Sequence, residues 1–183
     1  MASVARALQT VLEMLRDRGV EAKLPHGHDD YVGGTCDVDV GGAWVAVRLG
    51  ARPAAALRDV VASAADEPMR SKHWIIAVTS EPVPHNKAAA LAAKCPVPLQ
   101  VFNLKELAFN ISTHRQVPQH TRASEEEVRA VMERHMLKSK VQLPLILRTD
   151  AMARYLGLRP GEVVRVERPS ATAGVTAVYR YCV

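Results

Sequence analysis

The sequence predicts an α/β (α+β) chain in two parts: a mixed sheet with flanking helices over residues 1–112, and a small mixed α/β module over residues 113–183. Helical and strand-like patterns alternate between residues 37 and 104, as expected for a sheet covered by helices. A polar connector without apolar periodicity, "STHRQVPQHTRA", then follows Asn110, and a second, shorter set of helix and strand signals comes after it. The 183 residues are enough for two small cores.

The first predicted element is an amphipathic helix over residues 4–16, which reads as part of the fold and not as a signal peptide. Its apolar face comprises Val4, Leu8, Val11, Leu12 and Leu15, and Gly19 supplies a stop signal. The loop "GHDDYVGG" follows. Two alternating runs, "TCDVDV" and "AWVAVRL", flank Gly41 and Gly42 and therefore predict a β-hairpin.

The next four elements alternate between helix and strand. Residues 53–65 predict a helix that begins at Pro53, and "KHWIIAVTS" predicts a strand buried on both faces. "VPHNKAAALAAK" predicts a short helix entered through Pro84, and "VPLQVFNL" predicts a second buried strand. This alternation completes the predicted N-terminal layer of sheet and helices.

The C-terminal module begins with a helix signal at residue 124. Ser124 and Glu127 have the spacing of a capping box. The apolar side predicted for this helix is Val128, Val131, Met132, His135 and Met136 or Leu137. "LPLILR" predicts a short strand, and "AMARYL" predicts a short helix capped by Asp150 and ended by Gly157.

Two turns and two strands complete the module. Pro160 and Gly161 mark a bend before a strand that ends in "VERP", "RPSATAG" predicts a connector, and "VTAVYRYCV" predicts a last strand. In this connector Pro169 fixes the backbone, Ser170 can bond to a nearby backbone N–H, and Gly174 permits a positive φ.

The positive charge is concentrated in the second part. Residues 1–111 carry 12 basic and 12 acidic side chains, whereas residues 112–183 carry 12 basic and 7 acidic ones. The excess is consistent either with solubility or with an acidic or polyanionic partner. The basic residues are scattered singly, which disfavours a free-standing DNA-binding protein.

The sequence lacks the motifs of several functional classes. No apolar run is long enough for a membrane span. Cys36, Cys95 and Cys182 are few and far apart, which disfavours a disulfide framework, and no cysteines or histidines have the spacing of zinc ligands. No phosphate-binding glycine loop and no GxSxG motif occurs.

Three polar groups remain candidates for chemistry. Asp37 and Asp39 share one strand face and can hold a metal ion or simply face solvent; the Glu-x-Lys partner of a nuclease site does not follow them. His26 and His28 with Asp29 can bind a metal or form a surface loop. His114 and His120 can act as an acid/base pair or fix the connector. No catalytic set can be assembled, so a binding or structural protein without cofactor or small-molecule substrate is favoured over a nuclease-like enzyme.

The C-terminal third resembles a known family. The segments "HRQVPQH", "SEEEV", "LPLI", "TDAMARYLGLRPGEVVRVERPSATAG" and "YR" are similar, in order and without gaps, to the shared fifth subunit of the eukaryotic nuclear RNA polymerases and to its shorter archaeal counterpart. Weaker similarity extends back through "VLEMLRDRGV", "CDVDV", "AWVAVRLG", "IIAVTSEPVPHNKAAALA" and "LQVFNLKELAFNIS".

The resemblance implies a non-catalytic subunit of a DNA-dependent RNA polymerase. It implies an N-terminal jaw domain beside downstream duplex DNA and a C-terminal module of the archaeal type that docks on the largest subunit, close to neighbouring small subunits. The docking residues carried over are Arg154, Tyr155, Gly157, Arg168, Pro169, Ser170, Gly174, Tyr179 and Arg180; the linker-fixing residues are His114, Pro118 and His120. Pro84, His85, Asn86 and Lys87, at the tip of the jaw, are the candidates for contact with DNA.

Several positions depart from the family pattern. Ala151, Leu145, Ala171 and Val175 stand where the family has Pro, Arg, Glu and Arg, and Arg115 and Gln116 stand where Glu and Leu are usual. Changed interface charges suggest a partner that has diverged together with this chain. The resemblance implies a nuclear location for a cellular protein, and the virion, host nucleus or cytoplasm for a viral one.

Overall fold

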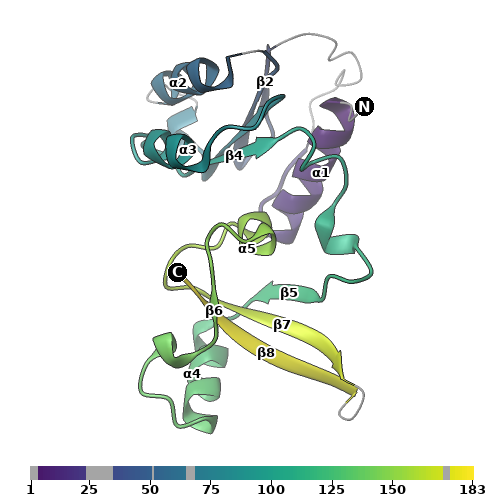
Figure 1. Cartoon of the computed structure of the whole chain (residues 1–183), viewed down its shortest axis with the longest axis vertical. Helices are drawn as coiled ribbons and strands as arrows, with labels where there is room; N and C mark the ends of the chain where they lie inside the picture. Colours follow the sequence, from purple (N-terminus) through teal and green to yellow (C-terminus); the bar gives the residue numbers. More distant parts are fainter. Residues whose placement is uncertain (1–3, 24–34, 51, 65–68, 171–173) are drawn as a thin grey trace. The chain divides into compact units, whose positions relative to one another are not determined.

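The computed structural model describes residues 4–23, 35–50, 52–64, 69–170 and 174–183. The chain divides into two compact units, Met1–Asn110 and Ile111–Val183 (Figure 1). Each unit contains a four-stranded mixed sheet with helices against it, so the predicted fold class is confirmed. None of the helices described is long and apolar enough to cross a bilayer.

The first unit is built on the sheet β1-β2-β3-β4. β1 (Thr35–Asp39) and β2 (Ala43–Arg48) form the predicted hairpin, whereas β3 (Trp74–Thr79) and β4 (Leu99–Asn103) are parallel to β2. Gly41 has a φ of 89°, which favours glycine at this bend. A Cβ on Gly42 would lie 2.3 Å from Val20 Cγ1, so the tight approach of the segment after α1 also favours glycine there.

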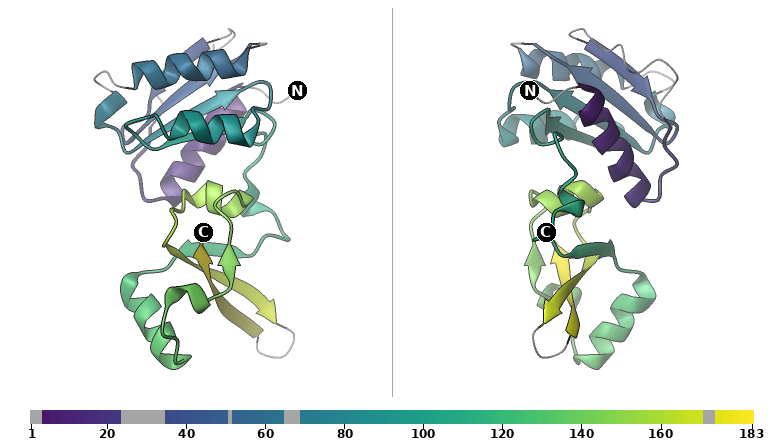
Figure 2. Two further views of the ribbon diagram at one scale, coloured as in Figure 1. Left: turned by 60° about the vertical axis from the view of Figure 1, so that its left-hand side comes forward. Right: turned by 90° about the vertical axis from the view of Figure 1, so that its right-hand side faces the viewer.

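Helices cover both faces of this sheet. α1 (Val4–Asp17) lies against one face, and α2 (Pro53–Ser63) and α3 (His85–Ala92) lie against the other (Figure 2). Ala46, Ile75 and Ala77 pack with Leu57 and Val60 of α2 on the second face. A short 3-10 helix, Met69–Ser71, precedes β3. The strand β3 is buried on both sides as predicted, but β4 is only partly buried because it is the outermost strand.

The second unit is built on the sheet β5-β7-β8-β6. Its strands are β5 (Gln119–Arg122), β6 (Leu145–Ile146), β7 (Val163–Ser170) and β8 (Gly174–Cys182). β7 pairs antiparallel with β5 and β8, and β6 pairs parallel with β8. The helices are α4 (Glu125–Arg134) and α5 (Ala151–Leu156), with short 3-10 helices at Ile111–Thr113 and Lys140–Gln142.

The sheet of the second unit has two distinct faces. Tyr179, Tyr181 and Val163 pack with Val128 and Val131 of α4, and we call this side the α4 face. Arg122 projects from the opposite side, since it pairs with Val164, and its Nη2 donates to the carbonyls of Leu156 and Gly157 at the end of α5 (3.2 and 3.5 Å). We call this side the α5 face.

Three predictions about the second unit are wrong in detail. α4 ends at Arg134, so His135 and Met136 are exposed and do not contribute to its apolar side, whereas Leu137 packs against the core. β6 has only two residues. β7 continues through Ser170, which was predicted to lie only in the connector, whereas Arg168 and Pro169 belonged to both the predicted strand and the predicted connector. Residues 171–173 lie outside the described part.

Only one of the two hydrogen bonds of the predicted capping box forms at the start of α4. Ser124 accepts a hydrogen bond from Glu127 N (3.1 Å). The Glu127 carboxylate instead accepts from Tyr179 Oη (2.7 Å) and pairs with Arg165 (3.3 Å). A reciprocal box forms at Ser139 and Gln142, which were not among the predicted caps.

Candidate functional site

The helix α5 is fixed in place by local signals at both of its ends. Asp150 Oδ1 accepts from the N–H groups of Met152 and Ala153 (2.9 and 3.4 Å) at the N-terminus. Gly157 adopts φ 65° and ψ 37° at the C-terminus, a conformation that favours glycine. Both predicted ends of this helix are therefore confirmed.

Three docking candidates belong to α5 and its C-terminal end. Tyr155 is buried, and Ser112 Oγ donates a hydrogen bond to its hydroxyl oxygen (3.2 Å). Arg154, one residue earlier on the helix, is half-buried. Tyr155 and Gly157 have internal structural roles, and the role of all three residues in docking stays a prediction.

The remaining docking candidates lie on β7 and β8. We use the name outer ribbon for residues 168–170 of β7 and 174–180 of β8. Its residues 168–170 and 174–176 continue beyond the end of β5 (Figure 1). Successive side chains of a strand alternate between faces. Arg168, Ser170, Gly174 and Arg180 consequently lie on the α5 face, and Pro169 and Tyr179 lie on the α4 face.

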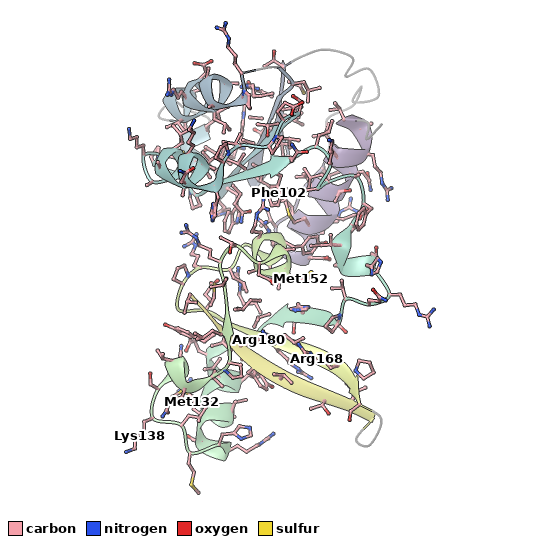
Figure 3. All side chains as sticks on the ribbon, viewed as in Figure 1. Phe102, Met132, Lys138, Met152, Arg168 and Arg180 are labelled. Atoms are coloured by element: carbon pink, nitrogen blue, oxygen red, sulfur yellow. The ribbon has the colours of Figure 1, made fainter. Side chains whose placement is uncertain are left out.

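The two candidate arginines are not neutralised internally. Arg168 is exposed, and Arg180 is half-buried, with its Nη1 donating to the Leu145 carbonyl (3.3 Å) (Figure 3). Among the residues that the structure describes, neither arginine is paired with a carboxylate. The α5 face of the outer ribbon therefore carries two positive charges that are available to a partner.

The opposite face carries a polar cluster that the sequence did not reveal. Glu127 accepts from Tyr179 Oη and pairs with Arg165, which also pairs with Glu167 (2.6 Å). Burial raises the pKa of Tyr179, and the Glu127 carboxylate raises it further because ionised Tyr179 would lie against a negative charge. No local motif identifies this cluster, because its members come from α4, β7 and β8.

The three linker-fixing candidates form local hydrogen bonds. His114 Nδ1 accepts from Gln116 N (3.2 Å), and His120 Nδ1 donates to the Pro118 carbonyl (2.7 Å). A carbonyl oxygen can only accept, so the latter bond places a proton on Nδ1 of His120. These bonds are consistent with fixing the backbone of the connector.

The predicted DNA-contacting residues lie at the start of α3. Pro84 is the N-cap residue, and His85, Asn86 and Lys87 are exposed in the first turn. Asn86 Oδ1 accepts from Lys87 N (2.8 Å). The initial N–H groups of a helix lack partners within the helix and carry partial positive charge.

The candidate metal site at Asp37 and Asp39 is occupied by basic side chains. Asp37 pairs with Arg48 and Asp39 with Lys72, each at 2.7 Å. Partial burial raises the pKa of Asp39, but hydrogen bonds from Lys72 and from Gly41 N outweigh this effect and hold the pKa below its usual value. Within the described ranges no group of metal-binding side chains occurs, and His26, His28 and Asp29 lie outside them.

Two of the three cysteines, Cys95 and Cys182, are poor candidates for a nucleophile. Cys182 is buried, and burial raises the pKa of the thiols of both Cys95 and Cys182. A thiol with a raised pKa remains protonated near neutral pH and is a poor nucleophile.

Comparisons with known proteins find similarity in the second unit. The family described as RNA polymerase Rpb5, C-terminal domain, matches residues 109–182. The chain is 44% identical over 87 residues to "DNA-directed RNA polymerases I, II, and III subunit rpabc1" of Dictyostelium discoideum, covering 48% of this chain and 44% of that protein. It is 45% identical over 85 residues to the RPABC1 subunit of Caenorhabditis elegans, covering 46% of this chain and 40% of the relative.

The chain thus aligns with less than half the length of these curated relatives. Their names describe a subunit shared by three RNA polymerases, which agrees with the resemblance inferred from the motifs. Residues 109–182, less than half of the chain, are similar to the C-terminal domain of the RNA polymerase subunit Rpb5.

Proposed function

We propose that this chain is a non-catalytic subunit of a multisubunit DNA-dependent RNA polymerase. The observation that carries the proposal is the family match over residues 109–182, which coincides with a compact unit that has its own sheet and helices. Its relatives are named as subunits shared by RNA polymerases I, II and III, so a nuclear location is part of the proposal.

The second unit is the docking module in this proposal. It binds the largest polymerase subunit, beside neighbouring small subunits, through the α5 face of the outer ribbon. Arg168 and Arg180 support this role because an arginine can form two parallel hydrogen bonds to a carboxylate. Burying such charges without a partner is costly, so the docking surface of the partner must supply acceptors.

Co-purification of the full chain from its native source tests the docking proposal. The expected result is recovery of the largest polymerase subunit in a stoichiometric complex with this chain. A shorter chain, residues 113–183, tests whether the second unit is sufficient. Cooperative melting of this shorter chain and recovery of the same subunit would support the proposal, and binding that requires residues 1–112 would contradict it.

The first unit lies beside downstream duplex DNA in the assembled enzyme. The exposed start of α3, with Lys87 in its first turn, is suited to a phosphate contact. One or two phosphate contacts give weak affinity and no sequence recognition, so the free chain is not expected to bind DNA at physiological salt.

A charge reversal tests the contact with DNA. In an assembled elongation complex, Lys87→Glu should reduce crosslinking of downstream DNA to α3 or make it more sensitive to salt. Lys94→Glu, an exposed lysine just beyond the C-terminal end of the same helix, is the matched control. Equal crosslinking by the wild-type chain and Lys87→Glu across a salt titration would show that this helix start does not contact DNA.

A further inference from the structure

The strand β8 has a free outer edge along most of its length. β7 pairs with it from Gly174 to Tyr181, whereas β6 on the other side pairs only with Tyr181 and Cys182. In the described part of the chain, no strand pairs with β8 on its β6 side between Gly174 and Arg180. Seven residues of strand are thus flanked on one side only.

The hydrogen bonds at the end of β8 show which backbone groups point outward. Cys182 N donates to the Glu162 carbonyl on the β7 side (2.9 Å), and Tyr181 N donates to the Pro144 carbonyl on the β6 side (2.8 Å). Backbone groups of a strand alternate in direction with period two. The N–H and C=O groups of Val175, Ala177 and Tyr179 therefore point to the free edge.

The outward backbone groups of Val175 and Ala177 are accessible to an added strand. Val175 is 68% exposed and Ala177 is also exposed. Neither residue forms a backbone hydrogen bond toward the free edge with any part of the chain that the structure describes. Exposed strand edges of this kind are normally paired, covered or blocked.

The equivalent edge of β7 is blocked. Val163 accepts from Ala123 N on the β5 side, so every second residue counted from Val163 points its backbone to that side. This alternation reaches Pro169, which lies beyond the end of β5. Proline has no N–H to offer to an added strand. The ribbon is therefore closed to a new strand on its β7 side and open on its β8 side.

The positive charges beside the open edge of β8 favour an acidic segment as the added strand. The side chains of Thr176, Val178 and Arg180 line the α5 face next to this edge, and Arg168 pairs with Thr176 from β7. The acidic side chains Glu125, Glu127, Asp150, Glu162 and Glu167 of this unit contact other groups, namely Lys140, Arg165, Arg122, Tyr179 and backbone N–H groups. The face presented to an added strand thus carries two positive side chains and no acidic one among Thr176, Val178, Arg180 and Arg168.

We propose that β8 is the docking strand of this chain, and that an extended, acidic segment of the largest polymerase subunit adds to the sheet along residues 174–180. Backbone hydrogen bonds from Val175 and Ala177 would supply affinity, and carboxylates placed at every second residue would pair with Arg180 and Arg168. This inference rests on the proposed function and specifies how the docking takes place.

A proline substitution tests the inference in the full-length chain, with the largest subunit of the polymerase from the same source as probe. Ala177→Pro removes one outward N–H but no hydrogen bond to β7. Ala177→Thr keeps the N–H and enlarges the same side chain, so it is the matched control. We expect Ala177→Pro to weaken binding about tenfold or more and Ala177→Thr to bind like the wild-type chain.

Charge reversal tests the chemistry of the occupant. Arg180→Glu should weaken binding about tenfold or more, whereas Arg129→Glu, on the exposed side of α4, should not. Equal losses for both variants would contradict an acidic segment at the α5 face.

Amide hydrogen exchange on the wild-type chain tests the edge independently of any variant. The N–H groups of Val175 and Ala177 should exchange fast in the free chain and about tenfold or more slowly in the complex. Thr176 and Val178, whose N–H groups point to β7, should be protected in both states.

A complex that leaves Val175 and Ala177 unprotected would overturn the edge pairing while the proposed function stands. Protection of both residues in the free chain would indicate pairing between two copies and would also overturn it, and failure of the wild-type chain to bind would overturn both proposals.

Discussion

The two sheets of this chain have the same number of strands but are covered to different extents. In the first unit, helices lie on both faces, and β3 is almost completely buried. In the second unit, the outer ribbon extends beyond β5, and its residues 174–177 are all exposed. A strand buried on both faces contributes mainly to stability, whereas an exposed ribbon with a blocked edge and an open edge is suited to binding. Substitutions in the two sheets should therefore affect different measurements.

The largest expected effect is on the stability of the first unit. Ile76 is fully buried in β3, so Ile76→Ala should lower the free energy of unfolding of this unit by about 2–5 kcal/mol, and Ile76→Val by about 0.5–1.5 kcal/mol. Urea titration measures both values. Binding of the largest polymerase subunit should remain unchanged, and a parallel loss of binding would show that the two units do not divide these roles.

The second prediction concerns binding without loss of stability. Arg168→Ala should weaken association with the largest subunit by about 2 kcal/mol or more, because the acceptor on the partner would be left buried and unpaired. The melting temperature should hardly change, because Arg168 is exposed in the free chain. A lower melting temperature with unchanged affinity would assign Arg168 to the fold instead.

A smaller effect is expected at the N-terminus of α5. Asp150→Ala removes the acceptor for the N–H groups of Met152 and Ala153 and should destabilise the second unit by about 1 kcal/mol. Asp150→Asn retains an acceptor oxygen and should restore most of this loss in thermal unfolding measurements. Equal destabilisation by both substitutions would show that charge, and not the hydrogen bond, matters at this position.

An effect of similar size at neutral pH is expected at Tyr179. Tyr179→Phe removes the hydrogen bond to Glu127 and should cost about 0.5–1.5 kcal/mol. The pKa of Tyr179 is raised in the folded state, so this contribution is fully present below the unfolded pKa of about 10 and is lost as the pH rises through the folded pKa.

Alkaline unfolding measured by circular dichroism tests this dependence on pH. The difference in stability between the wild-type chain and Tyr179→Phe should shrink as the pH rises above about 10. A constant difference across the pH range would contradict the raised pKa.

Local signals in the sequence predicted the local structure well. The glycine pair between alternating runs predicted the hairpin of β1 and β2, and Asp150 and Gly157 predicted both ends of α5. The apolar stripe of residues 4–16 predicted α1, whose Leu8, Val11, Leu12 and Leu15 are buried. Each of these signals depends on residues that are close together in the chain.

Features that depend on distant residues were not predictable in this way. Glu127 has the spacing of a capping residue, but Tyr179 and Arg165 compete for its carboxylate from two strands. The apolar residues around Leu145 suggested a longer strand, but only Leu145 and Ile146 pair with β8. The exposure of the outer ribbon follows from where β5 and β6 end, and no local pattern specifies those ends. The docking roles of Arg168 and Arg180 stay predictions for the same reason.

The order of strands in the second sheet also determines when this unit can form during synthesis. β5 can pair only with β7, and α4, β6 and α5 lie between these two strands in the sequence. β6 is part of the sheet only through its pairing with β8. Contacts between segments so distant in sequence form slowly, because the loop entropy must be lost first. The first unit, in contrast, completes its sheet at β4, before the second unit has been translated. A ribosome-bound chain should therefore carry a folded first unit and an open second unit until β8 has emerged, so the proposed binding surface should form after the first unit has folded.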